Sequence, residues 1–168
     1  MKAGAFRLAG AAAVALASVT LARADAPGTQ YGYFNSSAQV IQDNFTKLLW
    51  ERYPPAGTVT FDDALARCAT LSIGGVGGTW RLPTYKELLT IVDEAPHTEY
   101  DDGALVSKAI DPNAFPGTQV TPADWWTSSP AAGAAGASVY AINFSTGLAF
   151  EYDVTTLGYA RCVQYVGP

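Results

Sequence analysis

Residues 78–93 contain the feature that most constrains the fold, a helix start that the sequence specifies in detail. The segment reads Gly-Thr-Trp-Arg-Leu-Pro-Thr-Tyr-Lys-Glu-Leu-Leu-Thr-Ile-Val-Asp. Thr84 stands three residues before Glu87, the spacing of a capping box, in which each side chain accepts a hydrogen bond from the other residue's backbone amide. The apolar residues that follow have the spacing of one helix face, and they are Tyr85, Leu88, Leu89 and Val92. The segment therefore predicts a strand end, a proline stop and a helix lying on a core.

Another helix is predicted before this segment. Thr60 can act as its N-cap, and Asp62 and Asp63 would complement the helix dipole in the first turn. Its apolar face is Phe61, Ala64, Leu65, Cys68 and Ala69. Cys68 should therefore point into the core.

Strands are predicted on both sides of the helices. Two short strands, 39–42 and 46–52, flank a turn at Asp43-Asn44. After the helices come a strand over 125–130, a hairpin of 139–144 and 148–152, and a final strand over 158–166. In the hairpin, one face is expected to match Tyr140, Ile142 and Phe144 with Leu148, Phe150 and Tyr152. This order predicts an α+β domain with its helices segregated from antiparallel sheet.

The N-terminal residues are typical of a targeting signal. Lys2 and Arg7 precede an Ala/Val/Leu run over 8–21, and Ala22-Arg23-Ala24 has the form of a cleavage site. We therefore expect a signal peptide over 1–24, an extended lead-in over 25–37 and a domain over 38–168. No later apolar stretch is long enough to span a membrane, and the predicted location is secreted, periplasmic or on the cell surface.

The charge balance argues against nucleic acid as a partner. Lys2, Arg7 and Arg23 are three of the ten basic residues, so the segment from Asp25 on carries seven basic and fifteen acidic side chains, a net charge of −8. Binding to polyanions needs clustered Lys and Arg, and the remaining basic residues are scattered along the sequence.

The chain contains two cysteines, Cys68 and Cys162. In an oxidising compartment a disulfide between them is the simple interpretation, and it would tie the first helix to the last strand. A thiol nucleophile or a metal site would instead need a free cysteine near a histidine, and His97 is the single histidine of the chain.

Candidate ligand-binding residues have structural alternatives. Trp125 and Trp126, with Trp80, would suit a sugar-stacking platform, but tryptophans are also common in cores. Arg81 is a candidate ligand contact, or else it bonds backbone carbonyls or pairs with Glu87. We expect any binding site in the loops of 94–138.

A calcium site is the best metal hypothesis, because Ca²⁺ prefers several carboxylate and carbonyl oxygens from a flexible loop. The candidate ligands are Asp93, Glu94, Glu99, Asp101 and Asp102. They lack the spacing of a known calcium loop, so a solvated acidic loop is the alternative. No catalytic constellation is recognisable, since a Ser/His/Asp arrangement would have to recruit His97 from a loop.

A set of short motifs occurs in the order found in a known family. The most specific block is Trp80-Arg81-Leu82-Pro83-Thr84-x-x-Glu87-Leu88. It is accompanied by Asp43-Asn44-x-Thr46-x-x-x-Trp50-x-Arg52, Ala64-x-x-x-Cys68-x-x-Leu71, Gly75, Phe115, Trp126-Thr127-Ser128-Ser129 and Arg161-Cys162-Val163. Over residues 38–165 the chain resembles the bacterial DUF1566 family, also called the Lcl C-terminal domain.

The resemblance implies a secreted or surface-exposed module, linked in some members to adhesion and to sulfated glycosaminoglycans. The layout is also similar to the C-type lectin-like fold and to formylglycine-generating enzymes. The chain departs from these patterns at Lys47, where the family usually has glycine. The −8 charge weakens the carry-over of polyanion binding, and the calcium and sugar motifs of true C-type lectins are missing.

We therefore predict a non-enzymatic binding or adhesion module for a glycan or a cell-surface protein. The alternative is a structural or assembly subunit of a surface or periplasmic complex, with the Ala/Gly loop 131–137 and strand edges as the contact surface. A formylglycine-generating type of enzyme is a minor alternative. Homo-oligomer formation is left open, and no cofactor is expected apart from the calcium hypothesis.

Overall fold

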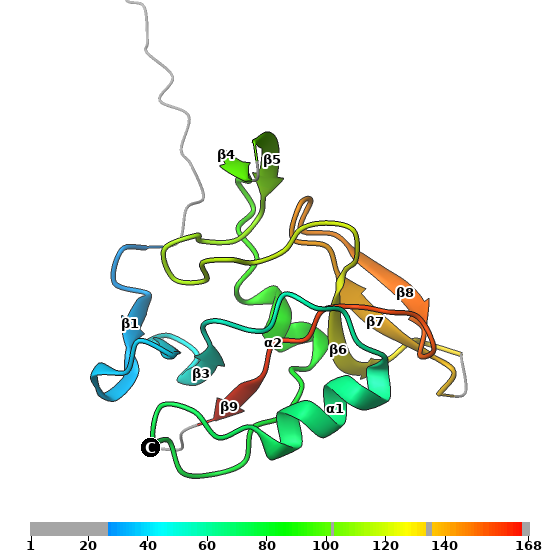
Figure 1. Cartoon of the computed structure of the whole chain (residues 1–168), viewed down its shortest axis with the longest axis horizontal. Helices are drawn as coiled ribbons and strands as arrows, with labels where there is room; N and C mark the ends of the chain where they lie inside the picture. The colour runs from blue at the N-terminus through cyan, green and yellow to red at the C-terminus, as the bar shows by residue number, and fades with distance from the viewer. Residues whose placement is uncertain (1–26, 102, 134–135, 166–168) are drawn as a thin grey trace, which may run out of the picture.

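The computed structural model describes residues 27–101, 103–133 and 136–165. Three antiparallel sheets, two helices and one disulfide make up this part of the chain (Figure 1), which agrees with the predicted α+β class. The elements in chain order are β1 (Tyr31–Tyr33), the 3₁₀ turn η1 (Phe34–Ser36), β2 (Val40–Asp43), β3 (Leu48–Glu51), α1 (Phe61–Thr70), α2 (Tyr85–Leu89), β4 (His97–Asp101), β5 (Ala104–Lys108), β6 (Trp125–Pro130), β7 (Ser138–Ile142), β8 (Ala149–Asp153) and β9 (Val163–Tyr165).

The first sheet has the strand order β1-β2-β3-β9, so it joins the beginning of the described chain to its end. Strand β1 falls in the predicted lead-in and pairs with β2. Every residue of β3 is buried. Trp50 packs in one hydrophobic cluster and Leu49 in another, because successive side chains of a strand point to opposite faces and both faces are covered.

The turn between β2 and β3 keeps a glycine-like conformation without a glycine. Lys47 has φ +62°, in the left-handed region that glycine adopts most easily. The buried carboxylate of Asp43 accepts hydrogen bonds from the amides of Phe45 and Thr46 at 2.8 and 3.3 Å, which holds the turn. Lysine at this position is therefore compatible with the hairpin.

The second sheet, β6-β7-β8, has the two helices on opposite faces. Trp125 and Ile142 are cross-strand partners and pack in the cluster that contains Leu88 of α2. Trp126 lies in the cluster that contains Ala64 and Cys68 of α1. The adjacent tryptophans therefore belong to different halves of the core.

The capping box predicted for α2 is confirmed. The Thr84 hydroxyl accepts from the Glu87 amide at 3.3 Å, and the Glu87 carboxylate accepts from the Thr84 amide at 2.8 Å. Thr60 caps α1 in the same way, accepting from the Asp63 amide. Helix α2 ends at Leu89 and is shorter than the predicted apolar face.

The predicted disulfide is confirmed. Cys68 of α1 is bonded to Cys162, which lies 94 residues along the chain and directly before β9. Closing a loop of this length contributes about 4–5 kcal/mol on the chain-entropy model. The final strand is shorter than predicted, because Gly158 and Tyr159 form isolated bridges to Val59 and Trp125 instead of continuing β9.

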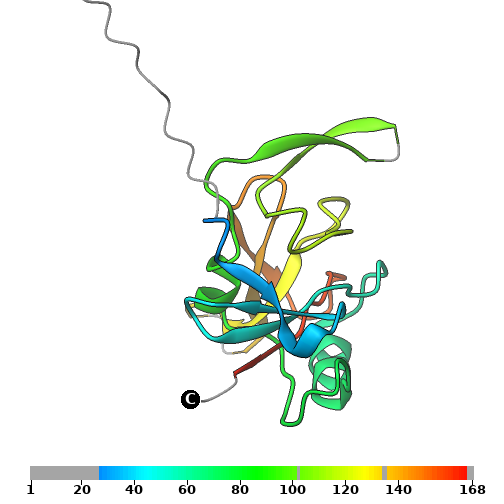
Figure 2. The same cartoon turned by 90° about the vertical axis from the view of Figure 1, so that its left-hand side faces the viewer.

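The acidic segment predicted as a loop contains a β-hairpin, β4–β5, which corrects that prediction. Figures 1 and 2 show this hairpin projecting from the rest of the molecule as an arm. Its pairs run from His97 with Lys108 to Asp101 with Ala104, and Gly103 in the turn has φ +81°. Tyr100 and Leu105 are directly opposed near the tip, and Tyr100 is 80% exposed.

The predicted β7–β8 hairpin is present, but its predicted face matching is wrong by one residue. Phe150 and Tyr152 pair with Ala141 and Val139, whereas Tyr140 pairs with Glu151. The turn is wider than expected. The side-chain oxygen Oδ1 of Asn143 accepts hydrogen bonds from the backbone amides of Ser145 and Thr146, and these bonds hold a longer loop. A shift of one residue places the whole strand's side chains on the other face.

Arg161, from the Arg-Cys-Val motif, is fully buried. Its guanidinium lies 4.8 Å from the ring centre of Phe115 and 5.1 Å from that of Trp125. It donates to the Glu51 carbonyl at 3.0 Å and to the Thr118 hydroxyl at 2.7 Å. Burial lowers the pKa of Arg161 to about 9, so the group stays charged at neutral pH.

Within the described residues, no helix combines the length and the hydrophobicity needed to cross a membrane.

Candidate functional site

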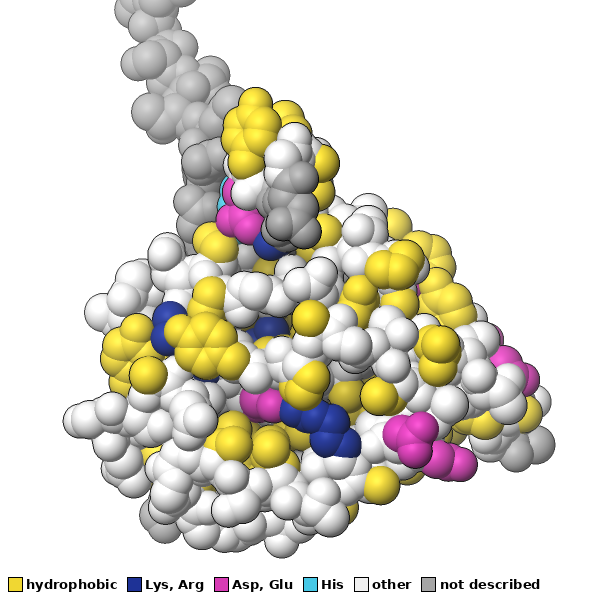
Figure 3. Space-filling view, in the orientation of Figure 1, with side chains coloured by type: hydrophobic (Ala, Val, Ile, Leu, Met, Phe, Trp, Pro, Cys, Tyr) yellow, Lys and Arg dark blue, Asp and Glu magenta, His cyan; other side chains and the backbone are white. Residues whose placement is uncertain are grey.

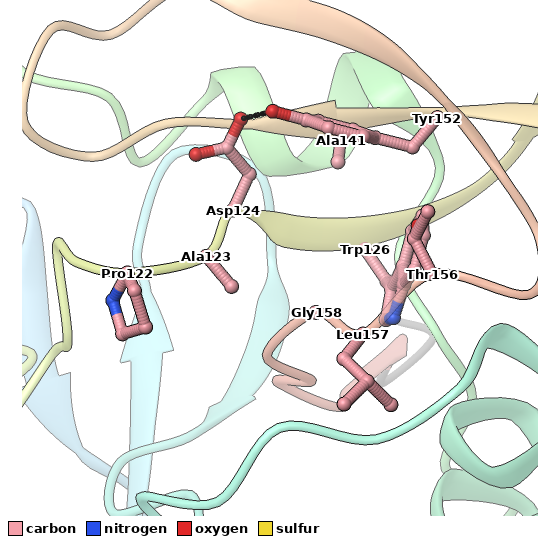
Figure 4. Close-up of a pocket in the computed structure, with 9 residues that line it drawn as sticks. All are labelled: Pro122, Ala123, Asp124, Trp126, Ala141, Tyr152, Thr156, Leu157 and Gly158. Atoms are coloured by element: carbon pink, nitrogen blue, oxygen red, sulfur yellow. Dashed lines mark hydrogen bonds between the residues drawn. The ribbon is translucent and has the colours of Figure 1, made fainter.

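A cavity beside the second sheet is the best-built candidate site. Its volume is about 110 Å³. Figure 4 shows its lining, with Asp124 on one side and Leu157 and Thr156 on the other. The lining residues are Pro122, Ala123, Asp124, Trp126, Ala141, Tyr152, Thr156, Leu157 and Gly158. The three-stranded sheet and the segment before β9 therefore build the cavity together.

Asp124 is positioned by the start of β6. Its carbonyl accepts from the Tyr159 amide at 2.8 Å, and the Trp126 amide donates to the Tyr159 carbonyl at 2.9 Å. These bonds hold the residue between the sheet and the segment that approaches β9. The side chain is 7% exposed and lines the cavity. The sequence thus places a carboxylate at a fixed point beside two strands.

Two neutral groups hold the Asp124 carboxylate. The Asn143 side-chain amide donates to Oδ1 at 2.7 Å, and the Tyr152 hydroxyl donates to Oδ2 at 3.0 Å (Figure 4 marks the second bond). Burial, and then the hydrogen bond and negative charge of Asp124, raise the pKa of Tyr152. The phenol therefore stays protonated and remains a donor to the carboxylate at neutral pH.

The cavity carries an unbalanced acid. None of its nine lining residues is basic. The ion pairs among the described residues are Arg67–Glu51, Arg81–Glu87 and Lys108–Glu99, and His97 lies 3.9 Å from Glu99. Asp124 takes part in none of these pairs, so its charge is stabilised by hydrogen bonds from neutral donors alone.

Exposed apolar side chains surround the cavity mouth. Leu157 lines it and is 60% exposed, and Tyr152 is also exposed. Phe150 is exposed on the same face of β8 as Tyr152, because residues two apart on a strand share a face. Figure 3 shows hydrophobic side chains gathered over this part of the surface.

Gly158 is required by close packing at the cavity floor. A Cβ atom at this position would lie 2.7 Å from Cε2 of Trp126 and 2.9 Å from the Asp124 carbonyl oxygen. The Gly158 amide donates to the Val59 carbonyl at 2.9 Å. This bond holds the segment before β9 against the loop that precedes α1. Any larger residue would push this segment away from the cavity.

The tryptophans considered for a stacking platform are buried, which agrees with the core alternative. Trp125 and Trp126 are each 1% exposed. Their indole N–H groups donate to the backbone carbonyls of Gln119 at 2.7 Å and Val59 at 3.0 Å. Trp80 is equally buried. Trp126 still contributes to the site, because its ring forms part of the cavity wall.

Arg81 is committed to the helix start. Its guanidinium forms two hydrogen bonds with Glu87, at 2.8 and 2.5 Å, which is the pairing offered as the alternative to ligand binding. Burial opposes ionisation of Glu87, but the bonds from Arg81 and Thr84 outweigh it and hold the pKa of Glu87 below its usual range. The pair therefore extends the capping box to a third residue.

Among the described residues, three acids of the calcium hypothesis have other partners or are exposed. Glu99 pairs with Lys108 at 2.5 Å, and Asp93 accepts from the Ala95 amide at 2.9 Å. Glu94 is exposed, Asp101 lies in β4 and Asp102 falls outside the described residues. In the described ranges no three His, Cys, Asp or Glu side chains are placed to share a metal ion.

No sequence pattern singles out Asp124. It is a lone acid before two tryptophans, and its partners Asn143 and Tyr152 lie 19 and 28 residues away. Only the register of the sheet brings them together. Part of the cavity lining, Pro122 to Asp124, does fall in the loops of 94–138 where a site was expected.

The comparison with protein families identifies the class of the domain. The Lcl C-terminal domain family matches residues 39–164, more than half of the chain. The chain therefore belongs to the Lcl C-terminal domain family. A comparison with curated proteins found no match.

Proposed function

We propose that this chain is an extracytoplasmic, non-enzymatic binding module with the Asp124 cavity as its ligand site. The observation that carries the proposal is a nearly buried carboxylate, held by neutral donors, at a cavity with an exposed apolar rim. Small-ligand sites are commonly concave and mostly apolar, with a few polar groups that orient the ligand. The family match is compatible with this role and does not specify it.

A glycan is the ligand class that suits the site best. Each carboxylate oxygen of Asp124 accepts one bond within the protein and retains capacity for another, which a sugar hydroxyl can use. The exposed rings of Phe150 and Tyr152 and the side chain of Leu157 offer apolar contact for the CH groups of a sugar. A sulfated glycan is disfavoured here, because its charge has the same sign as Asp124.

The extracytoplasmic location is supported by two features. The first 24 residues have the pattern of a signal peptide, and they lie outside the described residues. The buried Cys68–Cys162 disulfide is typical of proteins from oxidising compartments. We also propose that the fold is C-type lectin-like, on the support of a first-helix cysteine that pairs near the last strand.

The non-enzymatic part of the proposal rests on the chemistry of the cavity. Its polar side chains are one carboxylate, one phenol and the hydroxyl of Thr156, without a basic group to activate a nucleophile. The formylglycine-generating alternative needs cysteine thiols, and both cysteines of this chain form the disulfide. Binding therefore accounts for the site more simply than catalysis.

An assembly subunit is the second candidate function, and the β4–β5 arm favours it. Tyr100 and Leu105 are paired near the tip of the arm and both are exposed. The arm itself projects from the rest of the molecule (Figure 2). Isolated two-stranded hairpins are marginally stable in water, so a partner would stabilise the arm. Light scattering during size exclusion separates the candidates, since a monomer at high concentration counts against self-assembly.

The binding function can be tested with a glycan array on the mature domain. We expect binding to at least one glycan class and its loss in Phe150→Ser, which removes an apolar contact beside the cavity. Phe45→Ser is the matched control, because Phe45 is also exposed but lies in the β2–β3 turn. Failure of the wild-type domain to bind any glycan class would overturn the proposal.

A further inference from the structure

We propose that the Asp124 cavity selects a sugar with a free ammonium group, that is, an unacetylated amino sugar. This inference rests on the proposed glycan-binding function and specifies its ligand. It is carried by the charge of the cavity and not by its shape alone.

Three other acids of the protein are balanced by basic side chains. Glu51, Glu87 and Glu99 each pair with a basic side chain at 4.0 Å or less. Asp124 is more buried than Glu87 and Glu99, yet it receives bonds only from an amide and a phenol. Burying a carboxylate without a cation is costly, because the lost hydration is only partly replaced. A cationic ligand would supply the missing charge.

Hydrogen-bond capacity leads to the same ligand. A carboxylate offers about four acceptor positions, and the protein fills two of those on Asp124. An ammonium group has three donors and no acceptor, so it can use the remaining positions without competing with Asn143 or Tyr152. A sulfate or carboxylate group on the ligand would instead be repelled by the Asp124 carboxylate, which has the same charge.

The remaining walls suit the ring that carries the amine. Aromatic side chains are common contacts for sugar rings, and Tyr152 and Trp126 both line the cavity. Leu157 at the mouth is apolar and exposed, so it can contact the CH groups of a pyranose. A volume of about 110 Å³ admits the ammonium group and the adjoining part of one ring, with the rest of an oligomer outside.

A lysine side chain presents the same ammonium group on a flexible stem. The amino sugar is favoured because the rim of Tyr152, Phe150 and Leu157 forms an extended apolar surface beside the cavity, which a rigid ring can cover at low entropic cost. Binding of lysine peptides is therefore kept as an outcome of the test.

The test compares two oligosaccharides that differ in one group. Glucosamine oligomers and N-acetylglucosamine oligomers of equal length are titrated into the mature domain by calorimetry, at a pH where the amine is protonated. We expect the glucosamine oligomer to bind about tenfold more tightly, the effect of one charge-assisted hydrogen bond. The preference should fall with added salt and as pH rises past the pKa of the sugar amine.

Two kinds of variant assign this preference to the cavity. Asp124→Asn keeps an acceptor for Asn143 and a partner for Tyr152 but removes the charge, so it should abolish the preference. Leu157→Lys places a cation at the mouth and should weaken glucosamine binding. Leu105→Lys is the matched control, since Leu105 is 62% exposed and lies on the arm, away from the cavity. These two leucines are exposed, so their variants should fold.

The outcomes are distinguishable. Equal affinity for both oligomers, or a preference that survives in Asp124→Asn, would overturn the amino-sugar inference and leave the binding function standing. Lysine peptides that bind while glucosamine oligomers do not would overturn it as well. If neither oligomer binds and the glycan array is also empty, both the inference and the proposed function fail.

Discussion

Glu51 and Asp124 are both nearly buried acids, but the protein treats their charges differently. Glu51 forms an ion pair with Arg67 and also accepts from the Cys162 amide at 3.2 Å. Asp124 accepts only from Asn143 and Tyr152 and lines a cavity. The first acid is balanced inside the fold, next to the disulfide. The second keeps a charge that a ligand can balance.

Asp43 shows that burial with neutral donors does not by itself make a site. It is also buried and accepts from backbone amides, but it is enclosed in the β2–β3 turn and holds that turn in place. Asp124 differs because its side chain borders open space beside exposed rings. The comparison therefore separates structural acids from a candidate ligand-binding acid by two observations, the absence of a cation and the presence of a cavity.

The largest expected effect concerns the disulfide beside Glu51. The double variant Cys68→Ala and Cys162→Ala should lose about 4 kcal/mol of unfolding free energy, because the unfolded chain is no longer closed into a long loop. Urea unfolding at pH 7 measures the loss, with the reduced wild type as control. A loss below about 1 kcal/mol would show that the Glu51 region does not depend on the bond.

Glu51→Gln should be the next most damaging change. It removes the charge that balances Arg67, and breaking a largely buried ion pair costs about 2–4 kcal/mol once the partial exposure of Arg67 is considered. The double variant with Arg67→Gln should recover part of the loss, since no unpaired cation remains. Without such recovery, the ion pair would not be the source of the effect.

Glu87→Gln removes an acid that is more exposed than Glu51, and its loss of unfolding free energy can be compared with that of Glu51→Gln. The pKa of Glu87 is held below its usual range, so its ionised form stabilises the folded state above the unfolded pKa of about 4.3. We expect a loss of about 1 kcal/mol or less at pH 7, because the Arg81 side chain is well exposed. The difference from wild type should vanish as pH falls through the folded pKa, and urea unfolding at several pH values measures it.

Asp124→Asn should have the smallest effect on stability, a change of less than about 1 kcal/mol in either direction. Asparagine can accept from Asn143 and donate to the Tyr152 oxygen, so both contacts can persist with one bond reversed, and the buried charge is removed. Thermal unfolding of Asp124→Asn and of Glu51→Gln under the same conditions measures the difference between the two variants. If the two variants are equally destabilised, the distinction between a structural and a ligand-binding acid is broken.

Local features were predictable from the sequence. The capping box at Thr84 and Glu87, the caps of both helices and the turn after Asp43 depend on residues within a few positions of one another. The pairing of Cys68 with Cys162 followed from the number of cysteines. The arm also has a local sequence signal, because an Asp-Gly pair is typical of hairpin turns, but the surrounding acids favour a loop.

The candidate site was not predictable, because it depends on register and layering. Trp125 and Trp126 could be expected in a strand, but only the two helices on opposite faces of the sheet explain why both are buried. The wider turn at Asn143 shifts β8 by one residue and places Tyr152, rather than Glu151, on the face with Trp126. Without that shift the phenol could not reach Asp124.

The position of the disulfide also determines how the molecule would respond to a stretching force. If the chain is pulled by its two ends, tension passes from Cys68 to Cys162 through the covalent bond and bypasses the residues between them. All the residues that line the cavity, Pro122 to Gly158, lie inside this bypassed loop. The covalent path of the force therefore bypasses the cavity, and tension reaches its walls only through non-covalent contacts, such as the hydrogen bonds from Trp126 and Gly158 to Val59.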